Sequence, residues 1–203
     1  PTFCAGGAAA VRRLAGGRVT GGRVWHTLGF PLARDTFGGA WLYEMRDDMV
    51  SLGLVAGLDS PDPRLALQAR LQELKAHPFF RGFLSGGEVV AYGAKAIPEG
   101  GYWALPRLAA SGVMLLGDAA GLVNTMRLKG VHLAIESGMA AAETVLDALG
   151  ADDLSAARLA AYDRKVKECE TGRELYAVRN FRQPYQRLLL VGMLHTVLQR
   201  MTH

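Results

Sequence analysis

The chain has 203 residues, of which 50% are hydrophobic, enough to bury the core of one domain, or of one domain with an attached lobe. Its net charge of +4 is unevenly spread, with five arginines and no acid before residue 35, 16 acidic and 10 basic groups in 35–163, and eight basic and three acidic groups in 164–203. The basic ends suggest contact with an anionic surface, but no recognised motif favours nucleic acid, and two isolated cysteines argue against a disulfide or a metal site.

The first 24 residues, 1–24, give little structural information. They are rich in glycine and alanine and lack the continuous apolar core of a signal peptide, so we expect a poorly defined lead-in. Their glycine pairs do not have the G-x-G-x-x-G spacing that binds a dinucleotide pyrophosphate, and no strand is predicted before them.

Residues 25–110 have the pattern of a β-rich lobe. Segments 41–45 and 49–55, joined by 46–48, predict an antiparallel hairpin. Segment 89–97 predicts a further strand that ends before a proline.

One helix is predicted within this lobe. Asp62 followed by Pro63 is typical of a helix start, and the helix should end before His77 and its following proline. Its apolar stripe consists of Leu67, Leu71 and Leu74.

Residues 111–150 contain the most informative pattern of the chain. The apolar run 113–116 predicts a strand covered on both faces, and Asp118 follows at its carboxyl end. Open α/β sheets bind ligands at that edge, where a carboxylate can accept hydrogen bonds from the ribityl hydroxyls of FAD. Gly117 and Gly121 let the backbone approach closely. The alternative is that Asp118 only caps a turn.

A helix is predicted to begin at Gly130. Its N–H groups, near Lys129 and Gly130, would carry the positive end of the helix dipole and stabilise negative charge such as that of a reduced flavin ring. Asn124 can add a polar contact there or can simply end a turn. The helix has a flank of small residues that should pack tightly, consisting of Gly130, Ala134, Gly138 and Ala142.

The C-terminal segment 184–201 is apolar and flanked by arginines. It is too short to cross a bilayer, which needs about 20 apolar residues. The pattern fits equally a buried core helix and a helix lying in the headgroup region, with Arg182, Arg187 and Arg200 at its ends.

The chain also resembles the electron transfer flavoprotein–ubiquinone oxidoreductases, a family of membrane-surface flavoproteins. Ordered words carry the resemblance over roughly residues 25–203 and around the segment already described: Trp25–Leu32, Thr36–Gly39, Val55–Asp59, His77–Pro78, Ala91–Ala96, Glu99–Gly101, Pro106–Leu108 and Glu174–Asn180. A chance match of so many collinear words is improbable.

The resemblance implies a hydroxylase-like flavoprotein of α+β class, with an α/β FAD-domain portion at 111–150, a β-rich quinone-binding lobe at 25–110, and a helical region at 151–203 with a membrane-surface helix. It implies FAD contacts from Gly117, Asp118, Ala119, Gly121, Asn124, Lys129, Gly130 and Val131. Thr36–Gly39 becomes the candidate quinone site, because adjacent glycines can present backbone polar groups to a quinone carbonyl while Phe37 lines an apolar slot. Without the resemblance, Gly38 and Gly39 read as a turn entering a strand.

The sequence departs from the family pattern in several places. The family has a tyrosine at Phe37 and a threonine at Val131, so two hydroxyl groups are lost here. It also holds a [4Fe–4S] cluster with about four cysteine ligands, which this chain lacks. Together with the absent G-x-G-x-x-G segment, this leads us to expect the middle part of a larger enzyme. His132 is expected to be structural.

The resemblance further implies an oxidoreductase in which FAD carries electrons from electron transfer flavoprotein to ubiquinone, and no residue of the chain is expected to act as an acid, base or nucleophile. The location implied is the surface of an inner membrane, on its cytoplasmic face in a bacterium or in the mitochondrion of a eukaryote. Two alternatives remain: a related FAD-dependent reductase, of the prenyl-lipid or nitrogen-fixation type, and a non-catalytic fragment that associates with membranes.

Overall fold

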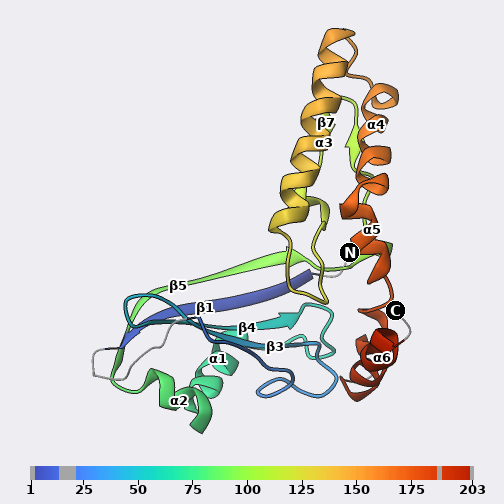
Figure 1. The fold of residues 1–203 in the computed structure, drawn as a ribbon. Coiled ribbons are helices and arrows are strands. Elements are labelled where there is room, and N and C mark those ends of the chain that lie inside the picture. Colours follow the sequence, from blue (N-terminus) through green and yellow to red (C-terminus); the bar gives the residue numbers. More distant parts are fainter. Residues whose placement is uncertain (1–2, 14–21, 187–188, 202–203) are drawn as a thin grey trace. The chain divides into compact units, whose positions relative to one another are not determined.

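The computed structural model describes residues 3–13, 22–186 and 189–201, and its contacts divide the chain into two compact units. The sheet unit consists of Cys4–Ala96 with Tyr185–Leu190, and the helical unit consists mainly of Ile97–Pro184 with Val191–His203. The two units are visible in Figure 1 and are described separately here. Helices and strands both contribute, which confirms the mixed fold class.

The sheet unit is built on five strands in the order β2-β3-β4-β1-β5. The strands span β1 (Phe3–Arg13), β2 (Val24–His26), β3 (Gly38–Glu44), β4 (Met49–Gly57) and β5 (Gly87–Pro98). The pairs β1–β4, β2–β3 and β3–β4 are antiparallel. Two short helices, α1 (Leu67–Ala76) and α2 (Pro78–Leu84), lie against one face of this sheet (Figure 1).

The alternation of side chains along β3 and β4 decides which face the helices cover. Even-numbered positions from Gly38 to Glu44 are buried, and odd-numbered positions are half-buried, as a strand with two unequal faces requires. The buried face forms one core with the helices, made chiefly of Leu42, Val50, Leu52, Leu54, Leu71, Leu74 and Phe80.

The predicted hairpin is confirmed, and its turn explains the register. Asp47 and Asp48 both have positive φ, 57° and 53°, which aspartate tolerates and which matches the twist of the two flanking strands. The Met45 N–H donates to the Met49 carbonyl at 2.8 Å and so closes the loop.

Two predictions for this unit are wrong. Phe3–Arg13 forms β1, inside the sheet, although residues 1–24 had been expected to be a poorly defined lead-in. The helix begins at Leu67 and not at Asp62, because the Asp62 carboxylate accepts from the Arg64 N–H at 2.9 Å and closes a local turn.

The helical unit has a three-helix core. It contains η1 (Tyr102–Ala104), β6 (Ala109–Ala110), β7 (Val113–Met114), η2 (Gly117–Ala120), α3 (Val131–Gly150), α4 (Ala156–Glu168), α5 (Glu170–Ala177), η3 (Gln183–Gln186, partly in the sheet unit) and α6 (Leu189–Met201). Side chains of α3, α4 and α5 form a continuous core that includes Leu133, Ala140, Leu159, Tyr162, Val166 and Leu175.

The expected strand 113–116 is shorter and more exposed than predicted. It is a two-residue strand, β7, and pairs antiparallel with β6. Val113 is 52% exposed and Leu116 is 36% exposed, so the expectation of a strand covered on both faces is wrong within the described part of the chain. The helix that follows is confirmed and begins at Val131.

The small-residue flank of α3 packs at only one of its predicted positions. Gly117 lies so close to Ala134 that an added Cβ would come within 2.9 Å of the alanine Cβ. Gly138 has open space where a Cβ would point, and Ala142 is exposed. The core-facing stripe is instead formed by Leu133, Ser137, Ala140, Ala141, Thr144 and Ala148.

Candidate functional site

Asp118 lies in η2, directly after β7, and its carboxylate is available to a ligand. The side chain is exposed, and it makes no hydrogen bond or ion pair with any residue that the structure describes. The alternative that it caps the turn therefore finds no support in the geometry. The Asp118 Oδ1 atom lies beside Gly130, where an added Cβ would be only 3.1 Å away.

The turn that carries Asp118 is fixed against α3. Gly117 has a φ of 54°, and its N–H donates to the buried Ser137 hydroxyl at 3.1 Å. The Tyr162 hydroxyl donates to the Leu115 carbonyl at 2.9 Å, just before the turn. Gly121 ends η2 in the left-handed conformation, with a φ of 75°. The backbone around Asp118 is thus held by buried contacts, while its side chain projects into solvent.

A short closed loop leads from this turn to α3. Asn124 and Lys129 are bridged by two backbone hydrogen bonds, of 2.8 and 3.3 Å, and Leu128 turns the loop with a φ of 54°. Gly130 follows as the N-cap of α3 and has no capping side chain. The first N–H groups of a helix lack partners within it, so this end of α3 offers donors and the positive end of a dipole.

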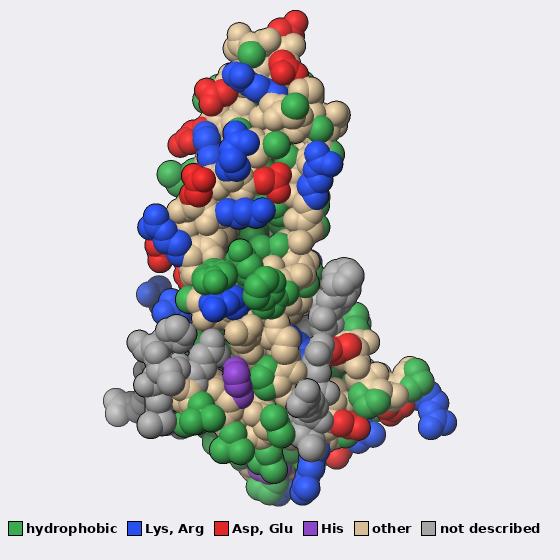
Figure 2. Space-filling model, turned by 90° about the vertical axis from the view of Figure 1, so that its right-hand side faces the viewer, with side chains coloured by type: hydrophobic (Ala, Val, Ile, Leu, Met, Phe, Trp, Pro, Cys, Tyr) green, Lys and Arg blue, Asp and Glu red, His purple; other side chains and the backbone are tan. Residues whose placement is uncertain are grey.

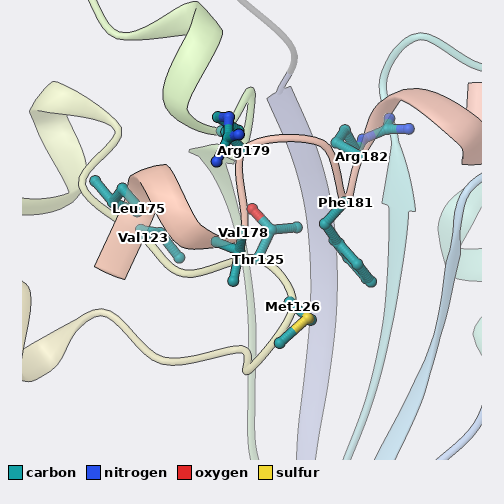
Figure 3. Close-up of a pocket in the computed structure, with 9 residues that line it drawn as sticks. Val123, Thr125, Met126, Leu175, Val178, Arg179, Phe181 and Arg182 are labelled. Carbon is teal, nitrogen blue, oxygen red and sulfur yellow. The ribbon is translucent and has the colours of Figure 1, made fainter. Parts of the chain in front are cut away.

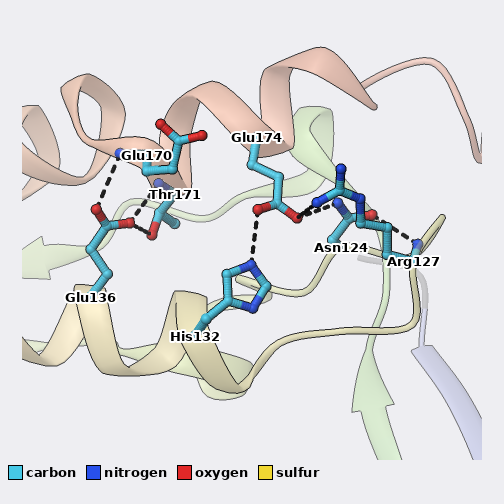
Figure 4. Close-up of polar contacts among 7 residues, drawn as sticks. All are labelled: Asn124, Arg127, His132, Glu136, Glu170, Thr171 and Glu174. Carbon is cyan, nitrogen blue, oxygen red and sulfur yellow. Dashed lines mark hydrogen bonds and ion pairs between the residues drawn. The ribbon is translucent and has the colours of Figure 1, made fainter.

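Glu174 of α5 anchors this loop from behind. Its carboxylate accepts from Asn124 Nδ2 at 2.5 Å and from His132 Nε2 at 2.9 Å, and Arg127 Nη1 lies 3.7 Å away (Figure 4). Burial by itself would raise the pKa of Glu174, but the hydrogen bonds from His132 and Asn124 and the nearby charges of His132 and Arg127 outweigh it and lower the pKa. His132 has the structural role that the sequence suggested.

A second carboxylate, Glu136, joins α3 to the start of α5. It accepts from the Thr171 N–H at 2.6 Å, from the Thr171 hydroxyl and from the Glu170 N–H at 3.2 Å (Figure 4). Cys169, the N-cap residue of α5, provides no side-chain cap, so a carboxylate from another helix satisfies these donors. Burial would raise the pKa of Glu136, but the hydrogen bonds from Thr171, Cys169 and Glu170 lower it overall.

We expect Glu136→Ala to lower the free energy of unfolding of the chain by about 1–2 kcal/mol, the usual cost of a lost helix cap. Urea denaturation followed by circular dichroism measures this. Because its pKa is lower in the folded state, Glu136 stabilises the fold above the unfolded-state pKa of a glutamate, about 4.3, and this contribution is lost as the pH falls through the folded-state pKa. Equal stability of variant and wild type at pH 7 would contradict the cap.

A small pocket lies beneath the same loop in the helical unit (Figure 3). The Thr125 side chain is 5% exposed, and its buried hydroxyl has no hydrogen-bond partner among the described residues. The enclosed space of about 10 Å³ is enough for roughly one water molecule and far too small for a flavin or quinone ring. The pocket is lined by Gly101, Val123, Thr125, Met126, Leu175, Val178, Arg179, Phe181 and Arg182.

The candidate quinone residues all lie in the sheet unit. Phe37 contacts Tyr185 edge to face, with ring centroids 5.2 Å apart. Gly38 and Gly39 pair with Ala56 and Val55 in the β3–β4 ladder, and the Gly38 carbonyl accepts from the Gly29 N–H at 3.4 Å.

Packing alone explains both glycines. A Cβ added to Gly38, whose φ is 154°, would overlap the Val55 carbonyl oxygen, and one added to Gly39 would overlap the Thr27 carbonyl oxygen. Contact with a quinone at these residues stays a prediction.

The structure brings the predicted cofactor residues into one short stretch of the helical unit. Gly117, Asp118 and Ala119 lie in η2, Gly121 ends it, Asn124 and Lys129 close the loop, and Gly130 and Val131 begin α3. The Asn124 amide is already engaged with Glu174 and with the Arg127 N–H. Cofactor contact by each of these residues stays a prediction.

Sequence reasoning missed Glu174 and Glu136 as functional candidates. A signal for Glu174 was present, because it lies one helical turn after Thr171 and beside Leu175, on the buried side of α5. An acid on the buried side of a short helix needs partners, and the sequence could not name Asn124 and His132 as those partners.

Comparison with known proteins gives consistent matches. A family model described as "ETF-QO, ubiquinone-binding" matches residues 6–97, nearly the whole chain segment of the sheet unit. The probable electron transfer flavoprotein–ubiquinone oxidoreductase of Schizosaccharomyces pombe is 42% identical over 83% of this chain and 27% of its own length. The human electron transfer flavoprotein–ubiquinone oxidoreductase is 39% identical over 86% of this chain and 30% of its own length. The chain thus spans less than a third of these relatives.

Solved structures show the same fold at low identity. A geranylgeranyl bacteriochlorophyll reductase-like protein of Thermoplasma acidophilum aligns with a TM-score of 0.66 and 19% identity, over 92% of this chain and 44% of that one. The halogenase PltM in complex with FAD aligns with a TM-score of 0.55 and 13% identity, over 87% of this chain and 36% of that one. These similarities concern the fold alone.

Proposed function

Because this chain belongs to the electron transfer flavoprotein–ubiquinone oxidoreductase family, we propose that it forms part of an enzyme that passes electrons from electron transfer flavoprotein through FAD to ubiquinone. The helical unit would hold one side of the FAD, and the sheet unit would meet the quinone. The observation that carries the FAD assignment is the free carboxylate of Asp118 beside Gly130 at the start of α3.

The residues at this place fit a flavin. An alanine at Gly130 would place its Cβ against Asp118 Oδ1, so glycine keeps open the space that a ligand would use. Asp118 would accept hydrogen bonds from ribityl hydroxyls, and the N–H groups near Lys129 and Gly130 would face the ring. FAD would supply the redox chemistry, while these residues bind and orient it.

The quinone assignment has support of a different kind. The family model for ubiquinone binding covers residues 6–97, which include Phe37, Gly38 and Gly39. Phe37 provides an apolar ring at the start of β3, suited to the wall of a slot for a quinone. No residue of the slot beyond these three is proposed.

The membrane surface is the third proposed partner, and α6 is the segment that supports it. Leu190, Leu194, Val197 and Leu198 recur at helical spacing and are 58–67% exposed. Among the described residues no helix has both the length and the apolar character needed to cross a bilayer. An amphipathic helix can instead insert its apolar side at the lipid headgroups, of an inner membrane in this proposal.

Charge adds little to this support. Arg182, expected beside the membrane helix, is 4% exposed and therefore buried. Arg187 lies outside the described residues, as does the side chain of Arg200. Around α4, Figure 2 shows Lys and Arg intermixed with Asp and Glu, and Lys165 is paired with Glu143 at 2.8 Å. The case for a membrane surface therefore depends on the apolar side of α6.

We expect the double variant L194E/L198E to lose binding to phospholipid vesicles by tenfold or more, because burying each leucine is worth roughly 1.5–3 kcal/mol. Co-sedimentation with vesicles containing anionic phospholipid measures the binding. Leu146→Glu, at a 70% exposed position of α3, is the control and should bind like the wild type. Equal binding by all three proteins would remove α6 from the proposal.

The test of the FAD assignment is a visible absorbance spectrum of the purified chain after incubation with FAD and gel filtration. Flavin retained with the folded protein supports the site at Asp118. A folded, colourless protein would show that the residues on this chain do not hold FAD by themselves. The similarity to the reductase-like structure concerns the fold alone, so a prenyl reductase is not proposed.

A further inference from the structure

Glu174 holds both ends of the loop that leads into α3. Its carboxyl group is 11% exposed at the side chain, and its two oxygens take different partners. Oε1 accepts from Asn124, at the beginning of the loop, and Oε2 accepts from His132, in the first turn of α3 (Figure 4). The loop between these residues carries Lys129 and Gly130.

The contact with Asn124 reaches the backbone of the loop directly. Asn124 is fully buried, its Oδ1 accepts from the Arg127 N–H at 3.0 Å, and its backbone forms both hydrogen bonds of the bridge to Lys129. Moving the Asn124 side chain would therefore shift the bridge. Gly130 is the next residue after the bridge, so its direction depends on the same contact.

Holding α5 against α3 does not require Glu174. That task is done nearby by Glu136 of α3, which caps the first N–H groups of α5 and bonds the Thr171 hydroxyl. The α3, α4 and α5 side chains also share one apolar core. The two carboxylates thus have separate partners: Glu136 contacts the end of a helix, and Glu174 contacts the loop.

We propose that Glu174 is a positioning residue for the flavin: by holding Asn124 and His132 it fixes the loop 124–130 so that the Lys129 and Gly130 backbone faces the flavin ring. This inference rests on the proposed function of the Asp118 region. Glu174 itself does not touch the cofactor. Its effect on the flavin passes through Asn124 and the Asn124–Lys129 bridge.

The test compares Glu174→Ala with Glu136→Ala, a matched variant in which a neighbouring carboxylate is lost from the same helix interface. The first measurement needs no flavin: amide hydrogen exchange of residues 121–133 by NMR. Glu174→Ala should speed exchange of the Asn124 and Lys129 amides tenfold or more and leave the middle of α5 unchanged. Glu136→Ala should speed exchange in α5 and leave the loop unchanged.

The second measurement is FAD binding and the visible spectrum of the bound flavin. Glu174→Ala should raise the Kd for FAD by about tenfold and shift the flavin absorbance bands, whereas Glu136→Ala should leave the band positions unchanged. Glu174→Gln, which keeps an acceptor oxygen for Asn124, should restore part of both effects.

The outcomes separate this inference from the proposed function. If wild type retains no FAD, the proposed function fails for this chain, whatever the exchange data show. If wild type binds FAD and Glu174→Ala leaves loop exchange or the flavin spectrum unchanged, the positioning role is overturned. Faster exchange over all of α5 in Glu174→Ala would equally overturn it, because Glu174 would then serve only to hold the helix.

Discussion

Gly39→Ala should destabilise the sheet unit by about 3 kcal/mol or more and abolish its cooperative unfolding in the worst case. The new Cβ would overlap the Thr27 carbonyl oxygen, which belongs to the backbone and cannot swing away as a side chain can. Relief would require β3 to move away from the preceding segment, where the Thr27 N–H donates to the Ala40 carbonyl at 2.8 Å. Overpacking of this kind is among the few causes of very large single-residue effects.

Chemical denaturation monitored by tryptophan fluorescence measures this effect, since Trp25 and Trp41 both lie in the sheet unit. Gly93→Ala is the control: it lies in β5 of the same unit and has open space where the Cβ would point. A Gly39→Ala protein as stable as the Gly93→Ala protein would show that the β2–β3 region is arranged differently.

This expectation changes how the quinone site must be tested. A bulky residue at Gly39 might have seemed a clean way to block a quinone, but loss of turnover in such a variant would be explained by lost structure. Phe37 is a better position, because its half-buried ring can be changed to leucine without a backbone clash.

Asp118→Ala should weaken FAD binding by roughly 10- to 100-fold and leave the stability of the chain within about 0.5 kcal/mol of wild type. The binding loss is expected because charge-assisted hydrogen bonds to ribityl hydroxyls would disappear. The stability is expected to hold because the carboxylate makes no hydrogen bond or ion pair with the described residues. Fluorescence titration of FAD and urea denaturation measure the two quantities.

Asp147→Ala provides the control, since Asp147 is an exposed aspartate near the far end of α3 and should not affect FAD binding. Equal FAD affinity in both variants would remove Asp118 from the proposed site. A large loss of stability in Asp118→Ala alone would indicate that the residue supports the turn and does not serve a ligand.

Local patterns predicted local features well. Asp47 and Asp48 between two apolar segments predicted the hairpin, and the apolar periodicity after Gly130 predicted α3. The start of α1 was missed because Asp–Pro suits both a helix start and a turn, and the side chain of Asp62 chose the turn. β1 was missed because its glycines and alanines carry little pattern, and pairing with β4 decides its conformation.

The sequence by itself determined the family, the mixed fold and the stretch of residues in which to look for the flavin site, because these depend on ordered words and local periodicity. Only the tertiary structure showed that the Asp118 carboxylate is free, that Gly39 faces a carbonyl oxygen, and that Glu174 binds Asn124 and His132. Glu174 lies 50 residues from Asn124 and 42 from His132 along the chain. Contacts of that span arise from the packing of α3 against α5, which no pattern in a single sequence reports.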